Sequence, residues 1–289
     1  MANIKDLKKR IKSTKSTLKI TSAMKLVSAA KLSKAQSRIQ GFKPYSNELE
    51  QTVKLASALA ENYKHQYLEE KEDGKKEILL VISSNKGLCG GYNSQLYKKV
   101  KAFLPTKEDV DVYFIGRKVE ELLKRDSVFG VKKFAYEKND PEYSEAREII
   151  EELAQKFING EVSKIHVAYN SFISAIEFEP RVQQVLPVSL SESEKEALLK
   201  EFPVDFLYEP GATEILDELI PEVLNTSVFT YMLDAIAAEH ATRMTAMDNA
   251  TKNSKEMIRN LTLTMNKLRQ AAITTELTEI VSGAESLNA

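Results

Sequence analysis

The sequence has few of the residues on which common catalytic and metal sites depend. It contains one cysteine, Cys89, no tryptophan and three histidines, His65, His166 and His240. A single cysteine excludes a disulfide within the chain, disfavours a cysteine metal cluster and is consistent with a reducing compartment. The histidines are scattered without the spacing of metal ligands. We therefore expect no metal site.

Long apolar runs are also missing. No stretch approaches the roughly 20 residues needed to span a bilayer, and the N-terminal residues lack the pattern of a signal peptide. The sequence therefore predicts neither a membrane-spanning helix nor a secretory leader. A length of 289 residues suits one or two domains.

Proline and glycine are absent from two long stretches. Neither occurs in the first 40 residues, and none occurs in the 61 residues from Glu222 to Ser282. Both stretches are predicted to be helices, of roughly 60 and 90 Å, which is longer than one globular domain encloses. Helices of this length need a partner helix, because propensity alone gives marginal stability. The sequence predicts a helical shaft that carries a head domain.

Apolar residues recur in both stretches at alternating steps of three and four, as in a coiled coil. The N-terminal seam is Ile4, Leu7, Ile11, Thr14, Leu18, Thr21, Lys25, Ser28, Leu32, Ala35, Ile39 and Phe42. The C-terminal seam is Met244, Met247, Thr251, Ser254, Ile258, Leu261, Met265, Leu268 and Ala272. Ile20, Met24 and Val27 form a second stripe beside the first seam. A helical bundle core has the same period, but no loop signal divides either stretch into bundle-length pieces.

Charge is unevenly distributed along the chain. Residues 1–45 carry 12 Lys or Arg and a single acid, Asp6, although the whole chain has a net charge of −1. Nucleic acid is one candidate partner, but aromatic interleaving and a recognisable binding motif are both missing. A transit peptide, a solvated basic face and a contact with acidic protein remain as alternatives. The sequence pattern alone does not choose among them.

The middle of the chain alternates short apolar runs with helical patterns. The expected strands cover residues 78–82, 110–115, 129–134, 165–169 and 176–185, and the expected helices cover 94–103, 117–124 and 141–157. This alternation predicts a parallel or mixed α/β sheet. A charged helix over 189–200 and a connector over 202–210 follow. The predicted divisions are 1–65 for the first shaft helix, 75–187 for the α/β domain, 188–210 for the connector and 211–289 for the second shaft helix.

A glycine-rich turn follows the first strand, with glycines at positions 87, 90 and 91. The spacing is not GxGxxG, and Lys86 precedes the glycines where a P-loop would have GK[ST] after them. A dinucleotide site would also need an acid after the second strand, where Gly116 and Arg117 stand. We interpret the segment as a tight strand-to-helix turn. Because no nucleophile, base or oxyanion pattern is present either, we expect no active site and no cofactor.

Four segments resemble the gamma subunit of rotary F-type ATP synthases of the bacterial type. The most specific is Ile273–Ala284, which reads ITTELTEIVSGA; the others are Ile20–Ala29, Lys86–Gly91 and Glu239–Thr251. They follow the family order and extend over nearly the whole chain. Asn85 stands where the family usually has Asp, and Cys89 without an inserted cysteine pair gives no sign of a thiol switch.

The resemblance implies an α/β fold plus a coiled coil, in which long antiparallel N- and C-terminal helices flank a central Rossmann-like α/β domain. It implies a non-catalytic rotor, one copy per complex, that turns inside a ring of three alpha and three beta subunits. Further implied partners are the epsilon subunit and the membrane c-ring, without nucleic acid. The implied location is peripheral, on the cytoplasmic face of the bacterial plasma membrane.

The resemblance also implies two groups of contact residues. Contacts with the alpha/beta ring are expected from Met24, Lys25, Arg269, Gln270, Thr274 and Glu276. A foot near the c-ring is expected from Lys43, Tyr45, Tyr208 and Glu209. A coiled-coil scaffold with a docking α/β domain and a small-molecule enzyme with helical extensions are the rival classes.

The antiparallel arrangement yields a register. If residue 60 lies opposite about residue 215, equal rise places Met1 opposite about residue 274. The last turns, from Thr275 to Ala284, are then predicted to extend beyond the coiled coil as a single helix.

Overall fold

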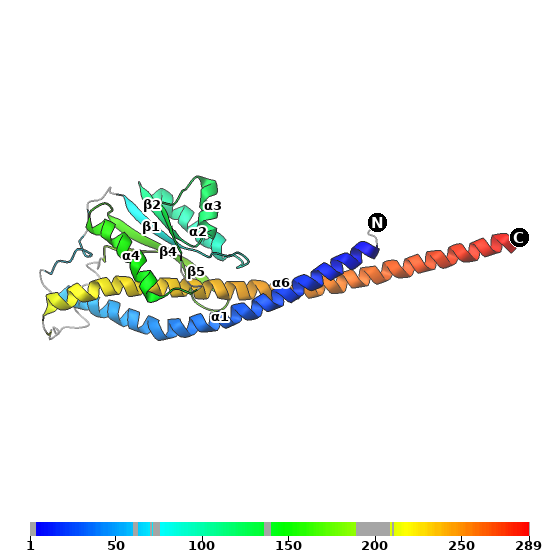
Figure 1. Cartoon of the computed structure of the whole chain (residues 1–289), viewed down its shortest axis with the longest axis horizontal. Helices are drawn as coiled ribbons and strands as arrows, with labels where there is room; N and C mark the ends of the chain where they lie inside the picture. Colours follow the sequence, from blue (N-terminus) through cyan, green and yellow to red (C-terminus); the bar gives the residue numbers. More distant parts are fainter. Residues whose placement is uncertain are drawn as a thin grey trace. The chain divides into compact units, whose positions relative to one another are not determined.

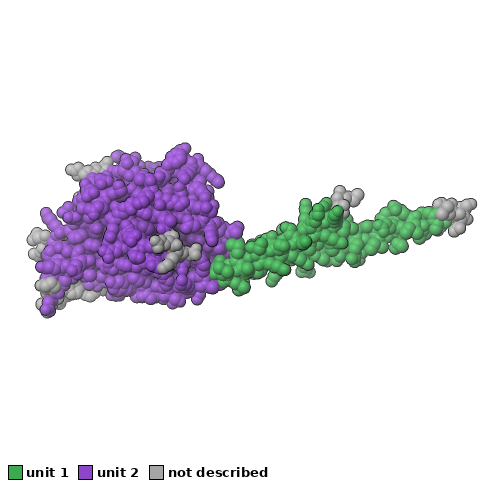
Figure 2. All heavy atoms as spheres, in the orientation of Figure 1, with its two compact units in different colours: residues 1–28, 244–289 green, residues 29–243 purple. Residues whose placement is uncertain are grey.

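The computed structural model describes residues 4–59, 63–69, 71, 76–135, 140–188, 209 and 211–288. The predicted charged helix over 189–200 lies outside these residues, and so does the predicted connector, including Tyr208, apart from Glu209. The chain divides into two compact units, one of residues 1–28 and 244–289 and one of residues 29–243 (Figure 2).

Two long helices, α1 (Ile4–Leu59) and α6 (Ala212–Asn288), contribute to both units (Figure 1). Each helix passes through a proline, Pro44 in α1 and Pro221 in α6. Proline removes one backbone hydrogen bond, so these turns depend on packing for their stability. The first helix ends at Leu59, short of the predicted boundary at residue 65, and Tyr63 lies beyond its end.

The α/β domain contains one five-stranded sheet in the order β3-β2-β1-β4-β5. The strands are β1 (Glu77–Ile82), β2 (Val110–Ile115), β3 (Lys132–Phe134), β4 (Lys164–Phe172) and β5 (Phe178–Leu186). β1 pairs in parallel with β2 and β4, β3 joins β2 in parallel, and β5 is antiparallel to β4. The sheet is therefore mixed, and the predicted fold class is confirmed.

Three helices and two short 3-10 turns connect the strands. The helices are α2 (Tyr92–Phe103), α3 (Lys118–Leu123) and α4 (Tyr143–Ile158), and the turns are η1 (Leu104–Thr106) and η2 (Lys124–Asp126). α4 begins with a capping box, in which Glu142 and Glu145 each accept from the other's backbone N–H. This cap fixes where α4 starts.

One layer of the core of this domain lies between β1 and the helices α2 and α3, and Ile78 and Leu80 of β1 are fully buried as well. Leu79 and Val81 are fully buried and pack with Leu96, Val100 and Leu123. Truncating one such leucine to alanine costs about 2–5 kcal/mol, because it leaves a cavity. The continuous apolar sequence of β1 thus reflects a strand covered on both faces.

Candidate functional site: a coupling surface on the paired helices

The predicted seams are the buried stripes of both long helices. Every N-terminal seam position from Ile4 to Phe42 is buried or half-buried, and so is every C-terminal seam position from Met244 to Ala272. Between the N-terminal positions, residues 5, 6, 8–10, 12, 13, 15–17 and 19 are all exposed. The three-four spacing therefore identified the paired faces correctly.

Side-chain contacts define the register of the unit formed by residues 1–28 and 244–289. Thr14 Oγ1 lies 3.9 Å from Met257 Sδ, and Thr21 Oγ1 accepts a 2.9 Å hydrogen bond from Thr251. As the residue number rises along α1, the number of the contacting residue on α6 falls, so the helices are antiparallel. Continuing this register places Ile4 opposite about residue 267, about one helical turn from the predicted pairing.

A polar cluster interrupts the seam between the two helices. Lys25 Nζ lies 2.6 Å from Asp248 Oδ1, and Lys252 Nζ lies 2.8 Å from Asp248 Oδ2. The hydrogen bond from Lys25 and that from Lys252 lower the pKa of the Asp248 carboxyl to about 2. Asp248 therefore stays ionised at neutral pH, and it holds Lys25 on the seam.

The outer face of α1 carries exposed apolar side chains beside its lysines. Ile20, Leu26 and Val27 are 60%, 70% and 57% exposed. The basic residues Lys8, Lys9, Arg10, Lys12, Lys15 and Lys19 are also exposed. Exposed apolar side chains flanked by charge are typical of a surface that a partner covers.

The end of α6 extends past the register of α1. Every residue from 273 to 284 is exposed. Leu277, Ile280 and Val281, on two successive turns, are 57%, 67% and 56% exposed. The prediction that these turns lie beyond the coiled coil is confirmed. A helix end with this much exposed apolar surface needs a surrounding partner.

The predicted ring-contact residues all lie in the unit of residues 1–28 and 244–289, on two surfaces. Met24 is half-buried and Lys25 is engaged with Asp248, whereas Arg269, Gln270, Thr274 and Glu276 are exposed near the end of α6. Thr274 Oγ1 donates back to the Gln270 carbonyl over 2.9 Å, which is a local helix contact.

The predicted foot residues lie in the unit of residues 29–243. Tyr45 is 51% exposed, with its ring 5.9 Å from that of Phe42, and Glu209 is exposed. Lys43, in contrast, points to α6, where its Nζ lies 3.3 Å from Asp234 Oδ2. Since Asp234 is buried, Lys43 compensates a carboxylate between the two helices. The sequence has no signal for this pair, because 191 positions separate its members.

The glycine-rich turn packs against α6. Arg243 donates to the carbonyls of Lys86 and Gly87 over 3.2 and 3.4 Å, and it pairs with Glu239 at 2.7 Å. Cys89 packs with Tyr92 and Ala238, and burial raises the pKa of its thiol. Carbonyls turned toward an arginine cannot cradle a phosphate, which needs N–H donors. The interpretation as a tight turn agrees with this geometry.

Gly116 shows why no acid follows the second strand. Its φ is +84°, and a Cβ there would lie 2.1 Å from the Ser83 carbonyl oxygen. No side chain fits this position. A ribose-binding acid is therefore sterically excluded at Gly116 itself.

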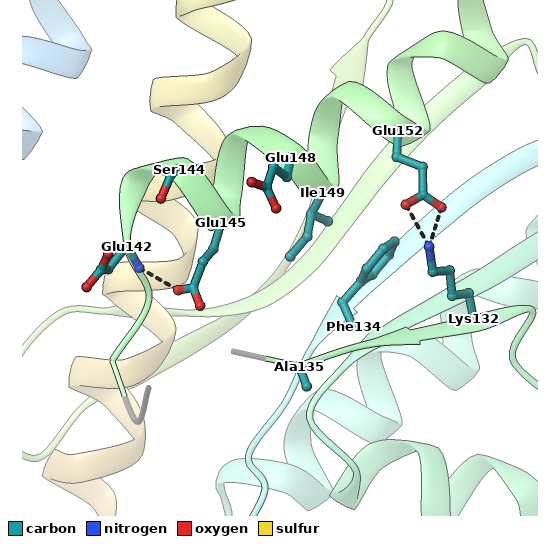
Figure 3. A pocket seen from close by; sticks show the side chains of 9 residues that line it. All are labelled: Lys132, Phe134, Ala135, Glu142, Ser144, Glu145, Glu148, Ile149 and Glu152. Atoms are coloured by element: carbon teal, nitrogen blue, oxygen red, sulfur yellow. Dashed lines mark hydrogen bonds and ion pairs between the residues drawn. The ribbon is translucent and has the colours of Figure 1, made fainter. Parts of the chain in front are cut away.

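The α/β domain has a hollow of about 420 Å³ between β3 and α4 (Figure 3). Its charged lining is Glu142, Glu145, Glu148, Glu152 and Lys132, and Lys132 lies 2.7 Å from Glu152. This negative lining disfavours the phosphates of a nucleotide. Among the residues that the structure describes, no group of three His, Cys, Asp or Glu could hold a metal ion.

Comparisons with known proteins place these features in a family. A sequence profile described as ATP synthase matches residues 3–287. The ATP synthase gamma chain of Lachnoclostridium phytofermentans is 41% identical over 292 residues, which is 100% of both chains. That of Trichlorobacter lovleyi is 39% identical over 99% of both chains. The chain belongs to the ATP synthase gamma chain family.

Membership of the gamma chain family confirms the resemblance and the prediction of a central-stalk subunit of the ATP synthase, a component of an enzyme complex. The rotor of the Euglena gracilis mitochondrial ATP synthase has the same fold, with a TM-score of 0.67 at 16% identity over 93% of this chain and 98% of that one. A Tetrahymena thermophila central stalk has a TM-score of 0.59 at 24% identity over 80% and 99%. In the described parts of this gamma chain, no helix is both long and apolar enough to span a bilayer.

One histidine of this gamma chain gives a pH prediction. Burial, then the nearby Arg243 and Lys31, lower the pKa of His240 to about 4, against a smaller opposing effect of Asp140. The unfolded chain therefore binds more protons between pH 6.5 and 4, and stability falls as pH falls, by up to about 1.4 kcal/mol per pH unit from this group. Replacing His240 with Gln should flatten the slope in urea unfolding. An unchanged slope would show that His240 titrates normally.

Proposed function

We propose that this chain is the rotor of an ATP synthase, which transmits rotation between a membrane c-ring and the catalytic sites of an alpha3-beta3 ring. The observation that carries the proposal is the end of α6, which is unpaired by α1 and exposes apolar side chains over residues 273–284. A terminus of this kind needs an enclosing surface that still allows turning. A soft seam of Met, Thr and Ser suits a helix pair that must twist under load.

The proposed partners are the alpha, beta and epsilon subunits and the c-ring, with one copy of this chain per complex and no nucleic acid. The similar structures are a mitochondrial central stalk with its c-ring and a mitochondrial assembly of OSCP, F1 and c-ring. The exposed lysines of α1 favour acidic protein as the surface that they face.

We assign the ring contacts to Met24, Lys25, Arg269, Gln270, Thr274 and Glu276. We assign the foot to Lys43, Tyr45, Tyr208 and Glu209. The side chain of Lys43 pairs with Asp234, so Lys43 would contribute to the foot by fixing the position of α1 there. The proposed location is peripheral, on the cytoplasmic face of a bacterial plasma membrane.

We further propose that the chain is not itself catalytic. The glycine turn presents carbonyls to Arg243, Gly116 excludes an acid at its own position, and the hollow beside α4 is acidic. Burial of the Cys89 thiol raises its pKa, which disfavours a nucleophilic thiolate.

One experiment with two arms tests the proposal. Titration of the purified chain with Mg-ATP should show no saturable heat, and coexpression with alpha and beta subunits should yield a complex with about three copies of each per chain. In that complex the chain should rotate during ATP hydrolysis. Micromolar ATP binding by the chain alone would contradict the non-catalytic role, and failure to join the ring would contradict the rotor.

A further inference from the structure

The residues that lead into α4 contact α1 within the unit of residues 29–243. Lys34 Nζ lies 2.8 Å from Asp140 Oδ2, and Arg38 Nη2 donates to the carbonyl of Pro141 over 2.8 Å. Lys34 and Arg38 are one turn apart on α1. Two successive turns of this helix are therefore bonded to two successive residues of the α/β domain.

The first residue of α4, Tyr143, contacts α6. Tyr143 OH donates to Glu222 Oε1 over 2.6 Å, and its ring lies 5.5 Å from Phe229 at 90°. Phe42 of α1 meets the same Phe229 at 4.9 Å and 90°, and the Arg38 guanidinium lies 5.7 Å from the centre of that ring. Phe229 is buried. Tyr143 is thus the residue of the α/β domain that bonds to α6 and packs beside α1.

The sheet side of α6 makes contacts of its own with the α/β domain. There, Tyr231 stacks on Tyr169 of β4 with centroids 4.4 Å apart, and Ser171 donates to Asp234 over 3.1 Å. Those contacts attach α6 to the sheet, and they reach α1 only through the pair of Asp234 with Lys43. The start of α4 bonds both helices to the domain, so it resists rotation of the domain about the pair.

The contacts at the start of α4 are of the kind that resists sliding and rotation. Apolar burial is non-directional and allows sliding. Hydrogen bonds to charged groups are directional and about twice as strong as neutral ones, and perpendicular aromatic packing restricts ring orientation. The capping box of Glu142 and Glu145 makes the turn that carries these groups rigid.

We propose that residues 140–143, with Lys34, Arg38 and Phe42 of α1 and Glu222 and Phe229 of α6, form the joint that passes torque between the α/β domain and the helix pair. Tyr143 is its central positioning residue. The inference rests on the proposed rotor function.

The test measures the torsional stiffness of the assembled rotor. A probe is attached to the α/β domain through Glu108→Cys, at an exposed position, whereas the native Cys89 is buried. The alpha3-beta3 ring is immobilised and stalled with a non-hydrolysable nucleotide. Stiffness is the inverse of the angular variance of the probe.

We expect Tyr143→Phe and Glu222→Gln each to raise the angular variance about two-fold, since each weakens the same charge-assisted hydrogen bond. The double variant should match the Tyr143→Phe single variant, because residues that act through one bond are not additive. Tyr97→Phe is the matched control. It also removes a tyrosine hydroxyl that donates to a carboxylate, that of Asp126, but within the α/β domain.

Three results would overturn the joint. Variance in Tyr143→Phe equal to that in Tyr97→Phe would show that the hydrogen bond bears no load. A strictly additive double variant would show that Tyr143 and Glu222 act separately. If the parent complex assembles but never rotates, the proposed function fails and the joint fails with it, whereas a rotating parent with unaltered variants contradicts the joint alone.

Discussion

Reversing Lys9, Arg10, Lys12 and Lys15 to Glu is expected to reduce association with the alpha3-beta3 ring by about 100-fold at low salt, while the α/β domain stays folded. All four side chains are exposed on α1. Exposed charges contribute little to stability singly, whereas complementary charge accelerates association. Binding kinetics at low and high salt measure the effect, which should shrink as salt screens the charges.

A matched charge control uses the α/β domain. Reversal of Lys98, Lys99, Lys124 and Arg125, all exposed, changes the net charge of the chain equally. This control should associate with the ring nearly as the parent does. Equal losses in both variants would assign the effect to net charge, and no loss at low salt in the α1 variant would mean that its basic face is only solvated.

Removal of residues 278–289 is expected to leave the isolated chain as stable as the parent, with Tm changed by less than about 2 °C. Residues 278–284 are exposed, so the isolated chain loses little packing. Within the complex the loss should be large, since burying each apolar side chain contributes about 1.5–3 kcal/mol. We expect the affinity for the ring to fall by about 100-fold. Where the complex still assembles, we expect the torque to fall as well.

Substitutions separate the apolar side chains of the tip from its length. Changing Leu277, Ile280 and Val281 to Ala should reproduce most of the loss, and changing Thr275, Thr278 and Glu279 to Ala on the same turns should not. If the shortened chain instead unfolds at a lower temperature when isolated, the tip packs on its own helix pair and the register is wrong.

The sequence predicted the paired helices because their requirements are local and periodic. A missing glycine or proline and a three-four seam determine helix and buried face without reference to the rest of the chain, and the observed burial follows the seam from Ile4 to Ala272. The strands were found for the same reason. The C-terminal motif then indicated the family, and equal rise along two helices led to the unpaired tip.

The positions of helix ends were harder to predict from the sequence. The sequence predicts the first shaft helix over residues 1–65, whereas α1 ends at Leu59. Tyr63 remains apolar and half-buried because it packs near Leu216 and Ile220 from outside the helix. Apolar spacing reports which residues are buried. A residue that is buried just after a helix end therefore looks in the sequence like a further position of the helix.

Polar partners far apart in the chain were decided by tertiary structure alone. Lys25 with Asp248, Lys43 with Asp234, Arg243 with the Gly87 carbonyl and Tyr143 with Glu222 each join segments that only the fold brings together. A charged or hydroxyl side chain looks the same in sequence whether it faces solvent or a partner. Sequence by itself determined which faces are apolar and hence that two helices pair, because burial has a period. The pairing of polar groups depended on the tertiary structure. A hydrogen bond is specified by distance and direction, and it leaves no periodic pattern in the sequence.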